Sequence, residues 1–233
     1  MPLRWIKARK RARQLLRDVS GVAVIELAIC LPPLLFMGMY GLELMNLAAT
    51  NLEVSQIALS LADNASRLGQ TDNSAVTPPV YETDIDSIMS GALKQGDRLD
   101  IGTRGKIVLS SLEKDKVTGK QYIHWQRCRG DLDAAPSYND SNNNGLRGTA
   151  ITGLGEGTTK VTAASDFNTA VMFVDVYYKY SRLFGDFFLH NDSIIHRQAA
   201  YLIRDDRDLA HDSKGSPEYP ALVGTRNGSD TCA

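Results

Sequence analysis

The sequence predicts an α+β protein in which a long N-terminal helix, transmembrane at first and amphipathic afterwards, packs on a small antiparallel sheet. Three observations support this prediction. Residues 27–42 contain no charged side chain. Apolar residues then recur at helical spacing as far as Leu68. Four later segments have the alternation or the short apolar runs that are typical of β-strands.

The charge of the chain is unevenly distributed. Residues 1–21 hold seven basic residues and one acidic residue, a net charge of +6, so the rest of the chain carries −7 of the total of −1. A basic segment can bind nucleic acid, but one that adjoins an apolar run more often sets membrane topology, because Lys and Arg stay in the cytoplasm. We therefore expect membrane lipid and not nucleic acid as a partner, with a cytoplasmic N-terminus and an exported C-terminal part.

The apolar run is long enough to cross a bilayer. Residues 22–42 form a helix of about 31 Å, which matches the thickness of the hydrocarbon layer. A cleavable secretory signal fits poorly, because Glu26 and Glu43 interrupt the run and no small-x-small site follows it. A buried helix of a cytosolic protein would not need seven basic residues before it. The sequence therefore favours a spanning segment over residues 22–45.

The helix is expected to continue beyond the membrane, over residues 46–69. The residues of one apolar stripe follow a spacing of three and four, and they are Val54, Ile57, Ala58, Leu61, Ala65 and Leu68. Gly69 follows as a candidate C-cap. Pro32 and Pro33 offer no N–H to the carbonyls of Ala28 and Ile29, which predicts a kink within the spanning segment.

Glu26 is the unexpected residue of the apolar run. An ionised carboxylate costs about 2.5–3.5 kcal/mol at the centre of a spanning helix and less near its end, where Glu26 lies. Cleavage after Gly21 would create a free amine on Val22, and residues 22 and 26 lie on one helix face. The new cation would thus stand within reach of the carboxylate, on the same chain or on a packed neighbour.

The stretch "SGVAVIELA" after a basic leader resembles the processing site of type IV prepilins, and more closely that of TadE-like pseudopilins of tight adherence systems. The matching features are Gly21, Ile25-Glu26, Pro32 or Pro33, and Gly41-Leu42-Glu43. They cover about a fifth of the chain. Leu27 departs from the family, which usually has an aromatic residue there, although many prepilins have leucine after the glutamate.

The resemblance implies a type IV pilin-like fold and a minor component of a thin adhesive pilus, the Flp pilus. Such a protein is the substrate of a prepilin peptidase and is not itself an enzyme. Its other partners would be further pilins or pseudopilins and the pilus assembly platform. Its location would be the bacterial inner membrane, as a single-pass protein with a periplasmic or extracellular domain, or the pilus itself.

The exported domain is expected to span residues 70–233. A short helix begins near Thr83, and the expected strands cover residues 106–112, 121–127, 169–184 and 193–204. A long connection over residues 130–168, rich in Gly, Asn, Asp and Ser, has the length of functional or mobile loops. The polar tail after Arg207 is expected to be loose unless Cys232 holds it.

Cysteine use is consistent with an exported domain. Cys30 lies inside the apolar run and is expected to stay free. In an oxidising compartment Cys128 and Cys232 are candidates for one disulfide, worth at most about 4–5 kcal/mol for a loop of this length. The alternative is two free thiols.

Motifs for catalysis or ligand binding are weak. In "DSNNNG", Asp140, Asn142, Asn144 and Gly145 match the start of a calcium loop, but Ile151 stands where glutamate should be the twelfth residue. A weak calcium site is thus the one candidate cofactor, against the alternative of a solvated Asn-rich turn. "GLGEGTT" at 153–159 lacks the flanking strand and helix of a phosphate loop, and the four histidines, His124, His190, His196 and His211, lack metal-ligand spacing.

Two functions therefore stand as hypotheses. The first is a pseudopilin that is cleaved and then joins or primes a tight adherence pilus. The second is a membrane-anchored extracytoplasmic binding module, an adhesin or a sensor, that never enters a filament. Glu26 separates them, because a plain anchor needs neither an intramembrane carboxylate nor a glycine before it.

Overall fold

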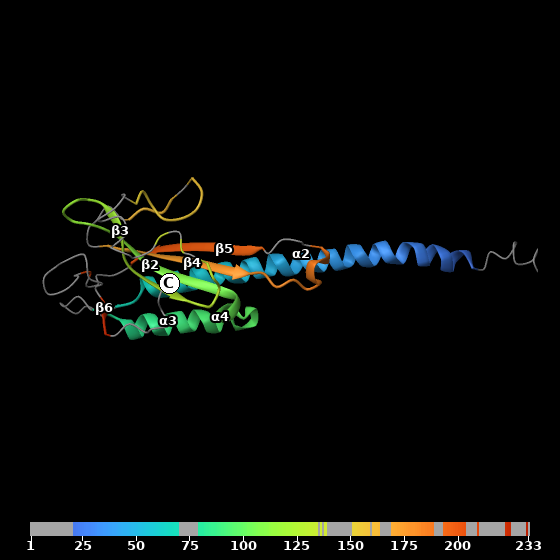
Figure 1. Cartoon of the computed structure of the whole chain (residues 1–233), viewed down its shortest axis with the longest axis horizontal. Coiled ribbons are helices and arrows are strands. Elements are labelled where there is room, and N and C mark those ends of the chain that lie inside the picture. The colour runs from blue at the N-terminus through green and yellow to red at the C-terminus, as the bar shows by residue number, and fades with distance from the viewer. Residues whose placement is uncertain are drawn as a thin grey trace, which may run out of the picture. The chain divides into compact units, whose positions relative to one another are not determined.

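The structure, a computed structural model, describes most of the chain, and its element labels are those of Figure 1. The described residues are 21–69, 79–134, 136, 138, 151–158, 160–163, 169–188, 193–203, 209, 222–224 and 232.

The chain divides into two units, which are described in turn. The first comprises Met1–Asn46 and Arg182–His190, and the second comprises Leu47–Ser181 and Asn191–Ala233. Helix α2, Val22–Ser66, contributes residues to both.

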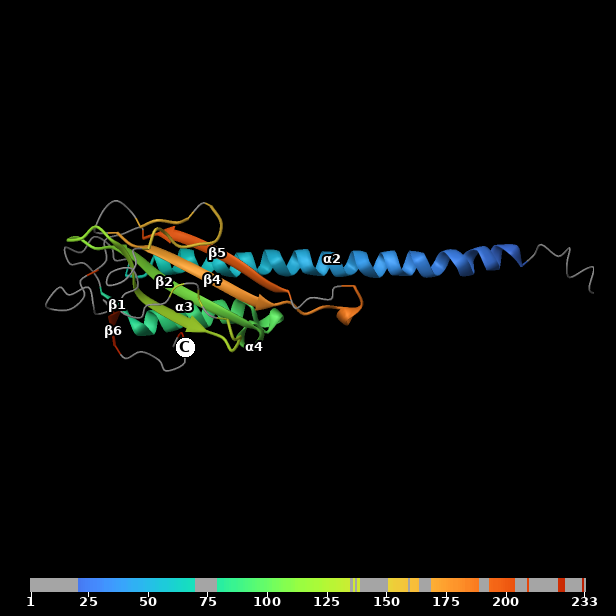
Figure 2. The same ribbon diagram turned by 45° about the horizontal axis from the view of Figure 1, so that its top comes forward.

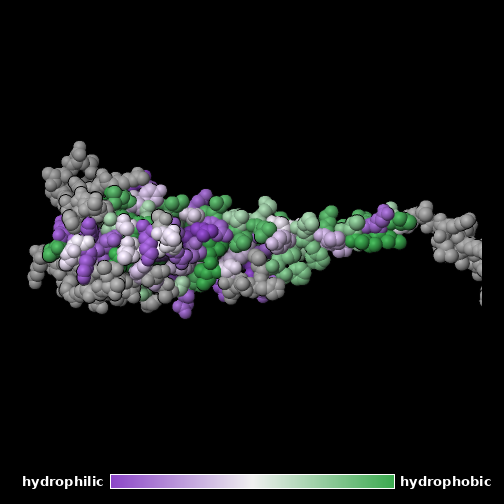
Figure 3. All heavy atoms as spheres, turned by 90° about the horizontal axis from the view of Figure 1, so that it is seen from above, coloured by the Kyte–Doolittle hydropathy of each residue, from purple (hydrophilic) through white to green (hydrophobic). Residues whose placement is uncertain are grey.

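The first unit consists of the N-terminal part of α2 and a segment that carries the 3-10 turn η2, Gly185–Phe187. The apolar residues of α2 remain largely exposed here, and Figure 3 shows the hydrophobic surface that they form. The segment after Arg182 contacts the helix through stacked rings of Phe36 and Phe187, whose centroids are 5.8 Å apart.

The second unit is built on a four-stranded antiparallel sheet with the strand order β3-β2-β4-β5. The strands are β2 (Gly105–Lys114), β3 (Gln121–Arg129), β4 (Val171–Lys179) and β5 (Ile194–Leu202). Helix α3, Glu82–Gln95, the turn η1, Asp97–Leu99, and the short helix α4, Ile101–Arg104, precede the sheet. The α+β fold class predicted from the sequence is confirmed.

Helices cover one face of this sheet. Residues opposite each other on neighbouring strands share a face of the sheet. Arg127 of β3 lies opposite Leu109 of β2, and Arg197 of β5 lies opposite Val176 of β4. The register between β2 and β4 puts both arginines on the same face. Arg127 binds Glu82 of α3, and Arg197 binds Asn51 of α2, so this is the face toward both helices (Figure 2). The stripe of α2 predicted from the sequence packs here, because its members from Val54 to Ala65 are at most 1% exposed.

The opposite face of the sheet is covered by a loop. Leu112, Ile123 and Phe173 of the strands form a buried cluster with Ile151 and Leu154 of the loop. The long connection predicted over residues 130–168 thus contributes to a second small core. The loop closes through paired backbone hydrogen bonds between Leu154 and Val161, both of 2.8 Å.

Most element boundaries lie within two residues of the expected ones, and two helix or strand ends need comment. The helix expected over residues 22–68 ends at Ser66, three residues before Gly69, whose φ is +77°. The third strand ends at Lys179 and not at residue 184. Residues 182–188 belong instead to the first unit, where they contact α2.

The C-terminal tail is attached at two of its described points. Strand β6, Leu222–Val223, pairs in parallel with β1, Val80–Tyr81. Cys232 forms the predicted disulfide with Cys128 on β3, with the Cα atoms 5.0 Å apart. Cys30 is free and exposed, also as predicted.

Candidate functional site

The predicted processing site coincides with the start of α2. Gly21 lies just before the helix, and its carbonyl accepts the N–H of Ile25 at 3.1 Å. Val22 is therefore the first helical residue, and Glu26 follows one turn later on an exposed position. A cut between Gly21 and Val22 would leave all of α2 intact and would remove one carbonyl acceptor.

The electrostatics of this helix end favour a nearby carboxylate. An α-helix carries roughly half a positive elementary charge at its N-terminus. Cleavage would add an ammonium on Val22 at the same place. Glu26, one turn further on, can offset both positive charges, and within the helix α2 it is the first acidic residue.

Helix α2 is long and apolar enough to cross a membrane, and it is the single such helix among the described residues. The helix continues through Pro32 and Pro33. The kink predicted at these prolines stays a prediction.

Glu43 occupies a site that the sequence did not predict. A position near the outer interface would allow a solvated carboxylate, but Glu43 is only 1% exposed. Its Oε2 atom accepts the backbone N–H groups of Leu183 and Phe184, both at 3.1 Å. A segment 140 residues further along the chain supplies the donors and covers Glu43, so its carboxylate is not solvated.

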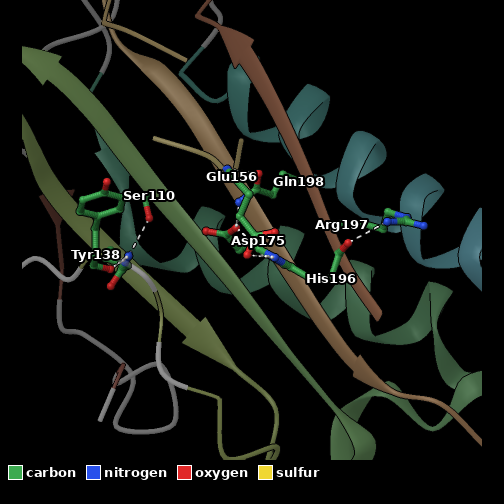
Figure 4. A network of polar contacts seen from close by, with 8 residues as sticks. Ser110, Tyr138, Glu156, Asp175, His196, Arg197 and Gln198 are labelled. Carbon is green, nitrogen blue, oxygen red and sulfur yellow. Dashed lines mark hydrogen bonds and ion pairs between the residues drawn. The ribbon is translucent and has the colours of Figure 1, made fainter. Parts of the chain in front are cut away.

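A second polar cluster lies on the loop-covered face of the sheet (Figure 4). His196 of β5 is held between two carboxylates: Nε2 lies 2.8 Å from Asp175 of β4, and Nδ1 lies 3.0 Å from Glu156 of the loop. Its ring stacks on the ring of Tyr177, with the two ring centroids 4.1 Å apart. Burial lowers the pKa of His196, but Asp175 and Glu156 outweigh it and raise the pKa above its ordinary value.

The glycines of "GLGEGTT" lie in the loop that carries Glu156. Gly153, Gly155 and Gly157 all have positive φ, a backbone conformation that glycine adopts without steric cost. Gln198 accepts the N–H of Glu156 at 3.0 Å and donates to Asp175 at 2.8 Å. The loop is thus attached to the sheet by polar contacts as well as by its apolar residues.

Further polar side chains are buried within the sheet. His124 lies 2.9 Å from Glu113, which also accepts from Ser111 and Tyr122. Burial and the adjacent Glu113 raise the pKa of Tyr122. Gln126 donates to the hydroxyl of Ser110 at 2.8 Å, in the network of Figure 4. These contacts tie neighbouring strands together.

The remaining candidate ligands from the sequence are the calcium-loop residues and two histidines. Asp140, Asn142 and Asn144, the candidate calcium ligands, lie outside the described residues, as do His190 and His211. Among the residues that the structure describes, no group of three or more His, Cys, Asp or Glu side chains is arranged to hold a metal ion. Arg129 of β3 contacts α3, where it binds Asp86 and Ser90.

Comparison of the chain with protein-family models, with curated proteins and with solved structures finds no match.

Proposed function

We propose that this chain is a minor pilin or pseudopilin of a tight adherence system, processed by a prepilin peptidase and needed for assembly of an adhesive Flp pilus. The observation that carries the proposal is the coincidence of three features at one helix end. Helix α2 begins directly after Gly21, Glu26 follows one turn later, and the exposed apolar surface of a candidate membrane span continues from there.

The architecture supports the same function. A filament subunit needs a helix whose first part packs against lipid or other subunits and whose second part belongs to a folded domain. Helix α2 has both parts: its apolar side chains from Val22 to Met45 are largely exposed, whereas the stripe from Val54 to Ala65 is buried. A soluble domain would gain nothing from so much exposed apolar surface.

The test is the N-terminus of the protein in membranes of cells that contain an active prepilin peptidase. We expect mass spectrometry to find Val22 as the first residue. Gly21→Arg should abolish processing, because it places a long charged side chain at the cut bond. Ser20→Arg is the matched control, since it adds the same charge one residue earlier and should be tolerated better. An intact leader in the unmodified protein would contradict the proposal and favour the anchored binding module.

A further inference from the structure

The segment 182–188 carries apolar side chains that nothing described in the chain covers. Leu183 is 57% exposed and Phe187 is 62% exposed. Phe187 contacts Phe36 of α2, which is 51% exposed, and Tyr40 of the same helix is 43% exposed. Such a contiguous apolar patch indicates a contact with another apolar surface.

The aromatic rings hold this segment on the helix. Phe187 stacks on Phe36, and Phe188 lies with its ring centroid 5.7 Å from that of Tyr40. Phe188 also contacts the rings of Phe184 and Phe187 edge to face, at 5.9 and 4.9 Å. The three rings of the segment and the two of the helix therefore form one cluster, which we call the aromatic patch: Phe36, Tyr40, Phe184, Phe187 and Phe188.

The depth of the patch follows from the helix rise. Counted from Val22 at the inner boundary, Phe36 lies about 21 Å and Tyr40 about 27 Å along α2, and Glu43 lies about 32 Å along it. A hydrocarbon layer of about 30 Å thus ends between Tyr40 and Glu43. The aromatic patch then falls within the outer 10 Å, the depth at which Phe and Leu of interfacial segments bury themselves.

Irregular backbone at this depth needs partners for its N–H groups. Glu43 supplies two such partners, since its carboxylate accepts the N–H groups of Leu183 and Phe184 at the outer boundary. Arg182 and Asp186 pair with each other, so the segment presents little net charge. Both features suit a segment that contacts the apolar part of the interface rather than the headgroup charges.

We propose that residues 182–188 form a second membrane contact, in which Leu183 and Phe187 insert into the outer interface of the bilayer beside α2. This inference rests on the proposed membrane-spanning role of α2. The segment would bind at the boundary between acyl chains and headgroups. Its insertion should therefore not depend on anionic lipid.

The experiment uses the full chain with Cys30→Ser and one added cysteine that carries the fluorophore NBD. Cys128 and Cys232 are bonded to each other and do not react. The protein is reconstituted in phosphatidylcholine vesicles with a doxyl quencher near the headgroup end of the acyl chains. At Phe187→Cys, and separately at Leu183→Cys, we expect NBD emission at short wavelength and strong quenching. Added phosphatidylglycerol or salt should change neither.

Two control positions distinguish the possible failures. Val117→Cys, 92% exposed in the turn between β2 and β3, should emit as in water and stay unquenched. Met37→Cys, 77% exposed on α2, should be quenched if the helix spans the bilayer. An unquenched label at residue 37 overturns the spanning helix itself. A quenched label at residue 37 with water-like labels at residues 183 and 187 overturns the second contact alone.

A third result would point to a different occupant. If the labels at residues 183 and 187 are shielded without lipid quenching, and the shielding disappears as the protein is diluted in lipid, the patch is covered by a second copy of the chain. That outcome also overturns the lipid contact.

Discussion

Two glutamates of one helix meet opposite surroundings. Glu26 is exposed near the start of α2, whereas Glu43 is buried and accepts two backbone N–H groups. Burial of a carboxylate is costly unless hydrogen bonds compensate for lost water. Glu43 is therefore a structural residue, which attaches segment 182–188 to α2, while Glu26 is exposed and accessible to a partner.

Glu43→Ala should release segment 182–188. Two N–H groups lose their acceptor, at a cost of about 1–3 kcal/mol each, so the segment should open at least about tenfold more often. Chymotrypsin cleaves after the Phe and Leu residues of the segment, and peptide mapping of the purified full chain measures the rate. Glu43→Gln keeps an acceptor oxygen and should have a smaller effect.

Glu53→Ala is the control for this experiment. Glu53 lies on the same helix and pairs with the exposed Arg98, so its loss should leave cleavage in segment 182–188 unchanged. Equal cleavage of the Glu43→Ala and Glu53→Ala proteins would show that the aromatic rings alone hold the segment.

At the scale of elements, the sequence predicted what depends on local periodicity. Alternation along β4 and β5, and the stripe of α2, placed the strands and the helix within a few residues of their observed bounds. Contacts between distant segments were not predictable in this way. Glu43 meets Leu183 across 140 residues, and Glu156 meets His196 across a loop with no regular pattern.

The loop that carries Glu156 should be held most firmly at low pH. His196 faces Asp175 of β4, Glu156 of the loop and the stacked Tyr177, and Lys106 lies opposite Tyr177 on β2. The carboxylates raise the pKa of His196 in the folded protein above its unfolded value of about 6.5. The resulting stabilisation is complete below about pH 6.5 and is lost as the pH rises through the folded-state pKa.

Thermal unfolding of the full chain between pH 5.5 and 8.5 measures this effect. We expect the midpoint to fall with rising pH, and His196→Gln should remove that part of the slope. Gln198→Ala is the control, because it removes contacts to Asp175 and Glu156 without removing a titrating group. It should lower the midpoint at every pH and leave the slope in place. An unchanged slope in His196→Gln would rule out this role.

At the scale of the whole molecule, the two units have different requirements. The second unit has two cores, a disulfide and a paired tail, and so it is stabilised by contacts of its own. The first unit exposes apolar side chains beside the carboxylate of Glu26, which calls for a membrane or neighbouring subunits. In the proposed function the subunit passes from the membrane into contact with neighbouring subunits. The surroundings of Glu26 must change in this step.

Glu26→Ala should therefore separate cleavage from assembly. Loss of the anion leaves membrane insertion unaffected or slightly easier. The ammonium on Val22 of its own or a neighbouring chain then lacks its partner in the assembled state, and an unpaired buried charge costs several kcal/mol. That cost shifts an assembly equilibrium by orders of magnitude, so the cleaved protein should accumulate in the inner membrane while pili become rare or absent.

Two variants calibrate this result. Glu26→Asp shortens the side chain by one methylene and should give intermediate piliation. Asp63→Ala removes another carboxylate of α2, one that pairs with the exposed Arg67 beyond the span, and should leave piliation normal. Pilus counts by electron microscopy, with cell-fraction blots for the cleaved protein, measure both. Normal piliation by Glu26→Ala would show that the carboxylate makes no assembly contact, and the anchored binding module would then be the better account of the chain.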